Sequence, residues 1–124
     1  MALTPTTSIA LGFDAPAFEL PDAISGQQLN ADDLFDGGPT VVIFMCNHCP
    51  FVIHLLDELV SLAKRYQARG VNFIGISSND VEAYPQDSFS NMKALGDSYN
   101  MPFPYLYDES QDVARAYDAA CTPD

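Results

Sequence analysis

The stretch over residues 41–77 constrains the fold more than any other part of the sequence. It begins with an unbroken apolar run, residues 41–45, that suits a strand buried on both faces. From Pro50 the apolar period changes to three and four residues, which predicts an amphipathic helix that ends near Gly70. Residues 71–77 form a second apolar run. The order strand, helix, strand forces the two strands to pair in parallel, so we expect a βαβ unit in an α/β fold.

The predicted helix carries a stripe of apolar side chains that we expect to face the sheet. The stripe follows three- and four-residue steps, as the inner face of an amphipathic helix does. Its members are Val52, Leu55, Leu59, Leu62 and Tyr66, with Leu56 and Ala63 beside them. Basic residues follow in the last turns, where they oppose the negative end of the helix dipole. The position of the stripe predicts which helix residues enter the core.

The remaining elements are shorter and flank this unit. An N-terminal extension over residues 13–35 is expected to contain two short strands, a turn at Ser25 and Gly26, and a helical turn near its end. After the βαβ unit we expect a helix over residues 87–99, a short strand in PFPYLYD, and a helix over residues 110–117 that a serine caps. A chain of 124 residues is long enough for one domain, over residues 1–124, and not for two.

The charge of the chain narrows its expected partners and compartment. Its 17 acidic and 5 basic residues give a formal charge of −12, which repels polyanions. Neither nucleic acid nor an anionic membrane surface is therefore an expected partner. The N-terminus lacks the basic region of a signal peptide, and no apolar run is long enough to cross a bilayer. We expect a cytoplasmic protein, in a compartment that keeps most thiols reduced.

Two of the three cysteines, Cys46 and Cys49, stand in the motif CNHC at the junction between the first strand and the helix. We place Cys46 at the last strand residue or at the helix N-cap, where free amides and the helix dipole would lower its pKa. Cys46 is therefore the expected nucleophile. Cys49, one turn into the helix, is expected to be more buried and to act as the resolving thiol. This spacing in this context is typical of a redox pair.

The histidines leave a metal site open as a competing interpretation. Cys46, His48, Cys49 and His54 offer sulfur and nitrogen ligands within nine residues, so a Cu(I) or zinc binding module is an alternative. His54 shares its angular position with polar residues, and the favoured prediction contains no metal. His48 lies between the two thiols and, if protonated, would favour the Cys46 thiolate and tune the redox potential. The third thiol, Cys121, stays outside the catalytic set because packing explains it equally well.

Four motifs carry a resemblance to one family. They are FMCNHCP, SSNDVEAYPQDS, MPFPYLYDE and ACTPD, and they span the chain from about Gly12 to its end. Together they resemble the peroxiredoxin-like branch of the AhpC/TSA, or redoxin, family in the thioredoxin-like superfamily. The resemblance implies that Cys46 and Cys49 match the redox-active pair. It also implies that Thr122 and Pro123 match a Thr-Pro pair whose proline is cis and whose preceding backbone pairs with the substrate.

Three departures from the family's pattern shape the prediction. When Cys49 is taken as a peroxidatic cysteine, Val42 and Cys46 occupy the places of the usual proline and threonine, so peroxide reduction is not the favoured activity. Thr40 stands where thioredoxins have a buried acid. The chain stops just after the expected cis-proline. We therefore expect a thioredoxin-like α/β fold, a βαβ core with an N-terminal extension, that lacks the two C-terminal strands and the last helix and could oligomerise through its open sheet edge.

These observations together predict a thiol–disulfide oxidoreductase. No organic cofactor is expected, because the sulfurs themselves hold the electrons. The expected partners are protein or small-molecule thiols and disulfides, together with a reductant that regenerates the dithiol. A thiol peroxidase with an antioxidant role and the Cu(I) or zinc binding module are the two alternatives.

Overall fold

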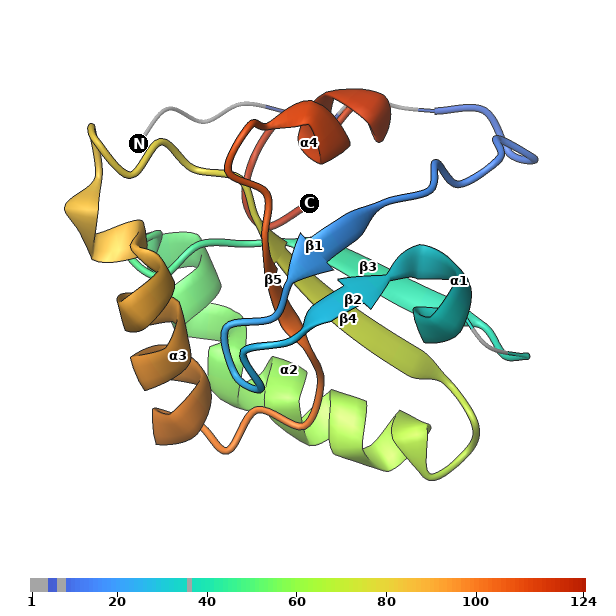
Figure 1. Cartoon of the computed structure of the whole chain (residues 1–124). Coiled ribbons are helices and arrows are strands. Elements are labelled where there is room, and N and C mark those ends of the chain that lie inside the picture. The colour runs from blue at the N-terminus through green and yellow to red at the C-terminus, as the bar shows by residue number, and fades with distance from the viewer. Residues whose placement is uncertain (1–4, 7–8, 36) are drawn as a thin grey trace.

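The computed structural model describes residues 5–6, 9–35 and 37–124 (Figure 1). Two short strands and a helical turn come first, then the central strands and helices, and last a short C-terminal helix. In chain order the elements are β1 (Glu19–Pro21), β2 (Gln28–Asn30), α1 (Ala31–Leu34), β3 (Thr40–Phe44), α2 (Pro50–Gln67), β4 (Asn72–Ser77), the 3-10 turn η1 (Pro85–Asp87), α3 (Phe89–Ser98), β5 (Tyr105–Tyr107) and α4 (Asp112–Ala116).

The predicted βαβ unit is present as β3, α2 and β4. The two strands pair in parallel, with Thr40 opposite Asn72 and Phe44 opposite Ile76. On its other side β4 pairs in parallel with β5, where Gly75 lies opposite Tyr105. The order of strands in this sheet is β3-β4-β5, so β4 is the central strand. An α/β fold with a parallel sheet is confirmed.

Strand β3 differs from its prediction in how deeply it is buried. Ile43 and Phe44 are buried, but Val41 is 41% exposed, so only the second half of the strand is buried on both faces. The cause is its place at the edge of the sheet. Backbone hydrogen bonds join Phe44 to Asp124 in both directions, whereas Val41 at the start of the strand stays open to solvent. Association through this edge stays a prediction, which light scattering would test.

The buried stripe of α2 is rotated from the predicted one. The buried residues are Val52, Leu56, Val60 and Ala63. Of the predicted stripe, Leu55 is 47% exposed and Tyr66 36% exposed. Apolar residues occupy more than one face of this helix, so their period does not show which face meets the sheet. Packing against β3 and β4 decides the rotation, and Leu56 and Ala63, expected beside the stripe, lie at its centre.

The N-terminal extension forms an antiparallel hairpin of β1 and β2 followed by α1, as predicted. Asn30 caps α1 by accepting a hydrogen bond from the amide of Asp33. The carboxylate of Asp22, at the hairpin turn, accepts hydrogen bonds from the amides of Ile24, Ser25 and Tyr105. Because Tyr105 belongs to β5, this buried carboxylate ties the hairpin to the sheet.

Helices α3 and α4 each begin two residues after the start that we predicted. Ser88 caps α3 through its hydroxyl, which accepts from the amide of Asn91. Helix α4 begins at Asp112 after Gln111, not after a serine cap as predicted. Its first amide, that of Asp112, donates to the Ser110 hydroxyl, and the next two, those of Val113 and Ala114, donate to the buried carboxylate of Asp108. A carboxylate from the preceding turn therefore shares the capping of α4 with the serine hydroxyl.

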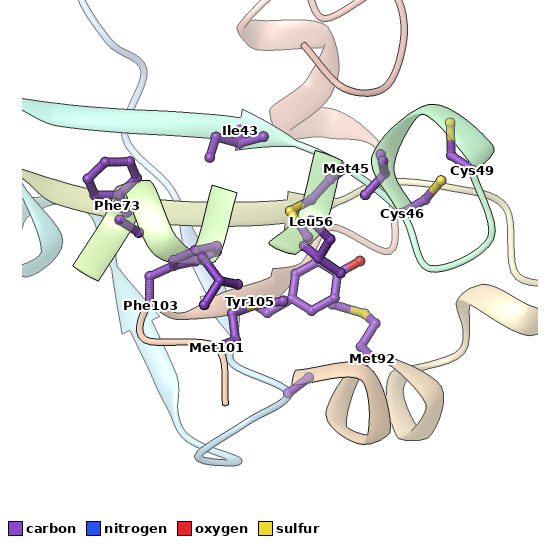
Figure 2. Packing of buried hydrophobic residues seen from close by; sticks show 14 residues of the cluster. Ile43, Met45, Cys46, Cys49, Leu56, Phe73, Met92, Met101, Phe103 and Tyr105 are labelled. Atoms are coloured by element: carbon purple, nitrogen blue, oxygen red, sulfur yellow. The ribbon is translucent and has the colours of Figure 1, made fainter. Parts of the chain in front are cut away.

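The two faces of the sheet carry separate apolar clusters, since neighbouring strand residues point to opposite sides. One cluster packs under α2 and α3, and Figure 2 shows it with Met45, Leu56, Met92 and Tyr105 at its centre. The other lies under the hairpin, α1 and α4, which cover the opposite face. Its buried residues are Phe18, Leu20, Ala31, Phe44, Ile74, Ile76 and Leu106. In the described part of the chain, every helix is too short or too polar to cross a membrane.

Candidate functional site

The cysteine motif lies on the connection between β3 and α2. Strand pairing continues past β3, because the amide of Met45 donates to the carbonyl of Ile76. Helix α2 begins only at Pro50, and Cys49 is its N-cap. The prediction that Cys46 ends the strand or caps the helix is therefore wrong. Proline at the first helical position is well suited to start a helix there, which moves the cap from Cys46 to Cys49.

The two thiols converge on a single residue from a distant part of the chain. Cys46 Sγ lies 3.6 Å from Thr122 Oγ1, and Cys49 Sγ donates to the Thr122 carbonyl over 3.4 Å. The peptide bond between Thr122 and Pro123 is cis, as the resemblance implied. Figure 2 shows the two cysteine side chains next to each other at the end of the apolar cluster. The structure thus brings together Cys46, Cys49 and the Thr-Pro pair.

The burial of the two thiols differs from the prediction. Cys49 is completely buried, as predicted. Cys46 is equally buried, whereas we expected the nucleophile to be the more exposed of the two thiols. Burial is the main cause that raises the pKa of the Cys46 thiol to about 11. Hydrogen bonds from Thr122 and from the backbone at Cys49 act in the opposite direction, and the charge of Asp87 raises the pKa further. The predicted lowering of this pKa is wrong, because desolvation outweighs the donors.

A buried carboxylate that sequence reasoning missed lies beside the thiols. Asp87 of η1 is fully buried, and its Oδ1 accepts a hydrogen bond from the amide of Asn47 at 2.8 Å. Its Oδ2 accepts from Nδ2 of Asn79 at 2.9 Å and lies 2.6 Å from Nδ1 of His48. Among the described residues His48 Nδ1 makes no hydrogen bond, so this approach is a close contact between the two side chains. Asp87 lies within the family-like motif SSNDVEAYPQDS, but nothing in that stretch singles out this carboxylate as a neighbour of the thiols.

His48 links this buried carboxylate to a cavity. Its side chain is 19% exposed, and its ring stacks on Tyr84 with centroids 4.6 Å apart and planes 13° apart. His48 lies near one of the two thiols, because a ring nitrogen of His48, Cys46 Sγ and a carboxylate oxygen of Asp87 all lie within 4.8 Å of one another. His54 is exposed, as predicted.

The motif loop is held in place by Asn47. Its Oδ1 accepts a hydrogen bond from the hydroxyl of Tyr105 at 2.9 Å, and its Nδ2 donates to the carbonyl of Gln86 at 2.9 Å. Burial raises the pKa of Tyr105 far above its usual range, so this hydroxyl stays protonated. The backbone amide of Asn47 also donates to the Asp87 carboxylate. Asn47 therefore connects β5, the cysteine loop and the segment around η1.

A cavity of about 400 Å³ lies next to the thiols. Thr122 and His48 form part of its wall, and Cys121 lines it too. The other lining residues are Phe44, Ser78, Asn79, Tyr84, Gln111, Ala114, Arg115, Ala119 and Ala120. Ser78 and Asn79, from the family-like motif SSNDVEAYPQDS, thus belong to the surroundings of the site. Thr122 separates this cavity from Cys46 and Cys49, because it lines the cavity and contacts both sulfurs.

Cys46, His48 and Asp87 also form the group, among the described residues, whose side chains lie close enough together to hold a metal ion. Two ligands of one tetrahedral zinc lie about 3.3 Å apart, given bond lengths of about 2.0–2.2 Å. The 2.6 Å between His48 Nδ1 and Asp87 Oδ2 is too short for two ligands of the same ion. This pair fits a direct contact between the two side chains instead.

Comparisons with known proteins agree with this arrangement. The AhpC/TSA family pattern matches residues 11–124. An uncharacterized conserved protein from Geobacillus kaustophilus is 51% identical with a TM-score of 0.94, over 96% of this chain and 63% of that one. A hypothetical protein from Sinorhizobium meliloti 1021 is 40% identical with a TM-score of 0.93, over 98% and 66%. The chain thus spans less than two thirds of the length of these two proteins.

A more distant match carries a functional description of its own. A secreted Mycobacterium tuberculosis disulfide oxidoreductase, homologous to E. coli DsbE, is 25% identical with a TM-score of 0.67, over 82% of this chain and 67% of that one. Solved thioredoxin-family domains match as well, which confirms the predicted thioredoxin-like fold. A search of curated proteins gave no match.

Proposed function

This chain belongs to the AhpC/TSA family, and we propose that it is a thiol–disulfide oxidoreductase whose redox pair is Cys46 and Cys49. The observation that carries the proposal is the convergence of both sulfurs on Thr122, at 3.6 and 3.4 Å from its atoms. The two thiols also act on each other directly, because the charge of Cys49 raises the pKa of the Cys46 thiol, which supports their being a pair. Residues 1–124 would perform this reaction as one domain.

The proposed reaction proceeds through a mixed disulfide. Cys46 loses its proton to a base, and the thiolate attacks one sulfur of a substrate disulfide. A bond forms between Cys46 and that sulfur, the substrate's own bond breaks, and the departing thiolate takes up a proton. Cys49, deprotonated in turn, attacks Cys46 and releases the second substrate thiol. The pair has then given two electrons to the substrate, and an external dithiol restores it through the same steps.

The remaining predicted residues have roles around this pair. Thr122 and Pro123 would shape the groove in which a substrate approaches Cys46. Because Cys46 is fully buried, we expect the substrate to arrive from the cavity side, where Thr122 forms the wall. His48, at the same wall, would tune the redox potential. The substrates would be protein or small-molecule disulfides and thiols, and a cytoplasmic location stays a prediction.

Thiol trapping followed by mass spectrometry tests the proposal. The protein is equilibrated in a graded series of glutathione redox buffers, and free thiols are alkylated. We expect Cys46 and Cys49 to lose their labels together in one two-electron transition, between about −120 and −270 mV, the range of known oxidoreductases. A Cys121→Ser variant should keep this transition. If both thiols stay labelled in every buffer, the proposal is wrong.

A thiol peroxidase is the second candidate, and the family match is the observation that favours it. A peroxidase would form sulfenic acid at one cysteine with stoichiometric peroxide. Val42 and Cys46 still stand where a peroxiredoxin has its proline and threonine. We therefore expect peroxide to oxidise the pair slowly, and rapid sulfenic acid formation at Cys49 would instead identify a peroxidase.

A further inference from the structure

We propose that His48 and Asp87 act together as the proton acceptor of Cys46, with Asp87 as the positioning residue and His48 as the group that takes the proton. This inference rests on the proposed function and adds the base that its first step needs. It assigns a role to Asp87, which lies 41 residues after Cys46 in the sequence and comes from a different element.

The geometry places His48 under two independent constraints. Nδ1 of the ring lies 2.6 Å from Asp87 Oδ2, and the ring face stacks on Tyr84. Asp87 is itself fixed, because it accepts hydrogen bonds from the Asn47 amide and the Asn79 side chain. A ring nitrogen of His48 lies within 4.8 Å of Cys46 Sγ. This distance can be bridged by one water, which is within the reach of a general base.

A buried thiol needs such a partner. The thiolate is the nucleophile, and in this site burial opposes its formation. The titratable groups that face Cys46 are Cys49 from the start of α2, Tyr105 from β5, Asp87 from η1 and His48 from its own loop. Tyr105 is neutral and weakly acidic here, so it cannot accept the proton. Among these groups His48 is the one that both lies within 4.8 Å of Cys46 Sγ and lines the cavity, and imidazole is the side chain that most often serves as a general base.

The proton has a path out of the site. Asp87 is completely buried, whereas the His48 side chain is 19% exposed and lines the cavity. The thiol proton moves from Cys46 Sγ to the imidazole, which leaves a thiolate beside an imidazolium paired with the Asp87 carboxylate. When the thiolate attacks, the imidazolium returns its proton to the departing substrate sulfur or to solvent in the cavity. Charge and protons balance at each step.

The charge of Asp87 has two opposite effects, and they make the inference testable. On its own the carboxylate repels the Cys46 thiolate and raises the pKa of that thiol. In the pair, the same carboxylate stabilises the imidazolium that forms when the proton moves. Removing the charge should therefore make the thiol more acidic at equilibrium and yet slow the exchange reaction near neutral pH.

Asp87→Asn is the variant that tests this. The pH dependence of thiolate absorbance at 240 nm in a Cys49→Ser, Cys121→Ser background isolates the Cys46 thiol. The rate of exchange with bis(2-hydroxyethyl) disulfide, a neutral substrate, is then measured from pH 6 to 10. We expect the Cys46 pKa to fall and the rate at pH 7 to fall about ten- to a hundredfold, less than most general bases contribute, because the lower pKa of the thiol offsets part of the loss. The two rates should converge as the pH approaches 10.

Each other outcome counts against the inference. A rate at pH 7 that rises with the lower pKa would show that Asp87 only repels the thiolate. A rate that is low by the same factor at every pH would show a structural role. If Asp87→Asn does not fold, His48→Gln takes its place and should lose the same rate at pH 7, and an unchanged rate would overturn the inference. If the wild-type pair forms no disulfide at all, the proposed function has failed rather than this inference.

Discussion

Asp87 and Asp108 are both buried carboxylates with several partners, but their surroundings differ in chemistry. Asp108 is 1% exposed and accepts hydrogen bonds from the Ser78 hydroxyl and from the amides of Val113 and Ala114. These three donors are neutral groups of a turn and a helix start. Asp87 contacts an imidazole and acts on the Cys46 thiol. Burial alone therefore does not mark a functional carboxylate, whereas titratable partners do.

The largest expected effect tests whether His48 and Asp87 work as a unit. Each single variant, His48→Gln and Asp87→Asn, could lower the exchange rate at pH 7 by up to about a hundredfold, the lower bound of a full general-base contribution. If the two side chains act together, the double variant should be about as slow as either single variant, because the second change removes nothing further. Rates that multiply, to about ten-thousandfold in the double variant, would show independent roles.

Asp108→Asn is the matched change at the other carboxylate. It removes a charge from a buried site whose partners are helix amides, so we expect a loss of about 1–3 kcal/mol in the free energy of unfolding. Urea unfolding measures this loss. The rate of exchange at Cys46 should stay within about twofold of the wild type. A change in the pH–rate profile would mean that Asp108 also acts on the thiols.

The free energy of unfolding at alkaline pH tests how strongly burial raises the pKa of the Cys46 thiol. Burial raises the pKa of this thiol from an ordinary value of 9.0 to about 11, so between these pH values the unfolded chain loses a proton that the folded chain keeps. The free energy of unfolding should therefore fall as pH rises through this window. Urea unfolding at pH 8, 9 and 10 should show a shallower fall for Cys46→Ala than for the wild type. Equal slopes would contradict the raised pKa.

The smallest expected effect concerns an exposed aspartate. Asp97 pairs with Lys93 four residues earlier in α3, over 3.0 Å, and both side chains are more than half exposed. Asp97→Asn should change the free energy of unfolding by about 0.5 kcal/mol or less, because water screens such pairs. The same urea assay applies. A loss as large as that of Asp108→Asn would break the argument that burial sets the cost of removing a carboxylate charge.

Much of the architecture could be predicted from local patterns. The apolar runs before and after α2 identified β3 and β4, and the hairpin turn and the α3 region were found close to their observed bounds. The rotation of α2 could not be predicted, because apolar side chains such as Leu55 and Leu56 occupy neighbouring faces. The cap of α2 was also missed, since Pro50 moves it to Cys49, and for α4 the carboxylate of Asp108 that shares the capping with Ser110 was missed.

The candidate site likewise has residues that the sequence predicted and residues that only the structure shows. The CNHC motif and the Thr-Pro pair were visible in the sequence, and the structure brings Cys46, Cys49 and Thr122 into contact. The role of Asp87 was not visible: it lies in the family-like motif SSNDVEAYPQDS, but its partners Asn47 and His48 stand about 40 residues earlier in the chain. The thiol pKa was predicted in the wrong direction, since the sequence shows the donors near Cys46 but not how completely the fold buries it.

The sequence by itself determined the parallel βαβ unit and the place of the cysteine pair at the junction of strand and helix, because periodicity and spacing act over a few neighbouring residues. Only the tertiary structure decided that Asp87, Thr122 and Tyr105 surround that junction, and that burial rather than the helix dipole controls Cys46. These contacts join segments 40 or more residues apart, and desolvation depends on all the atoms that pack around a group.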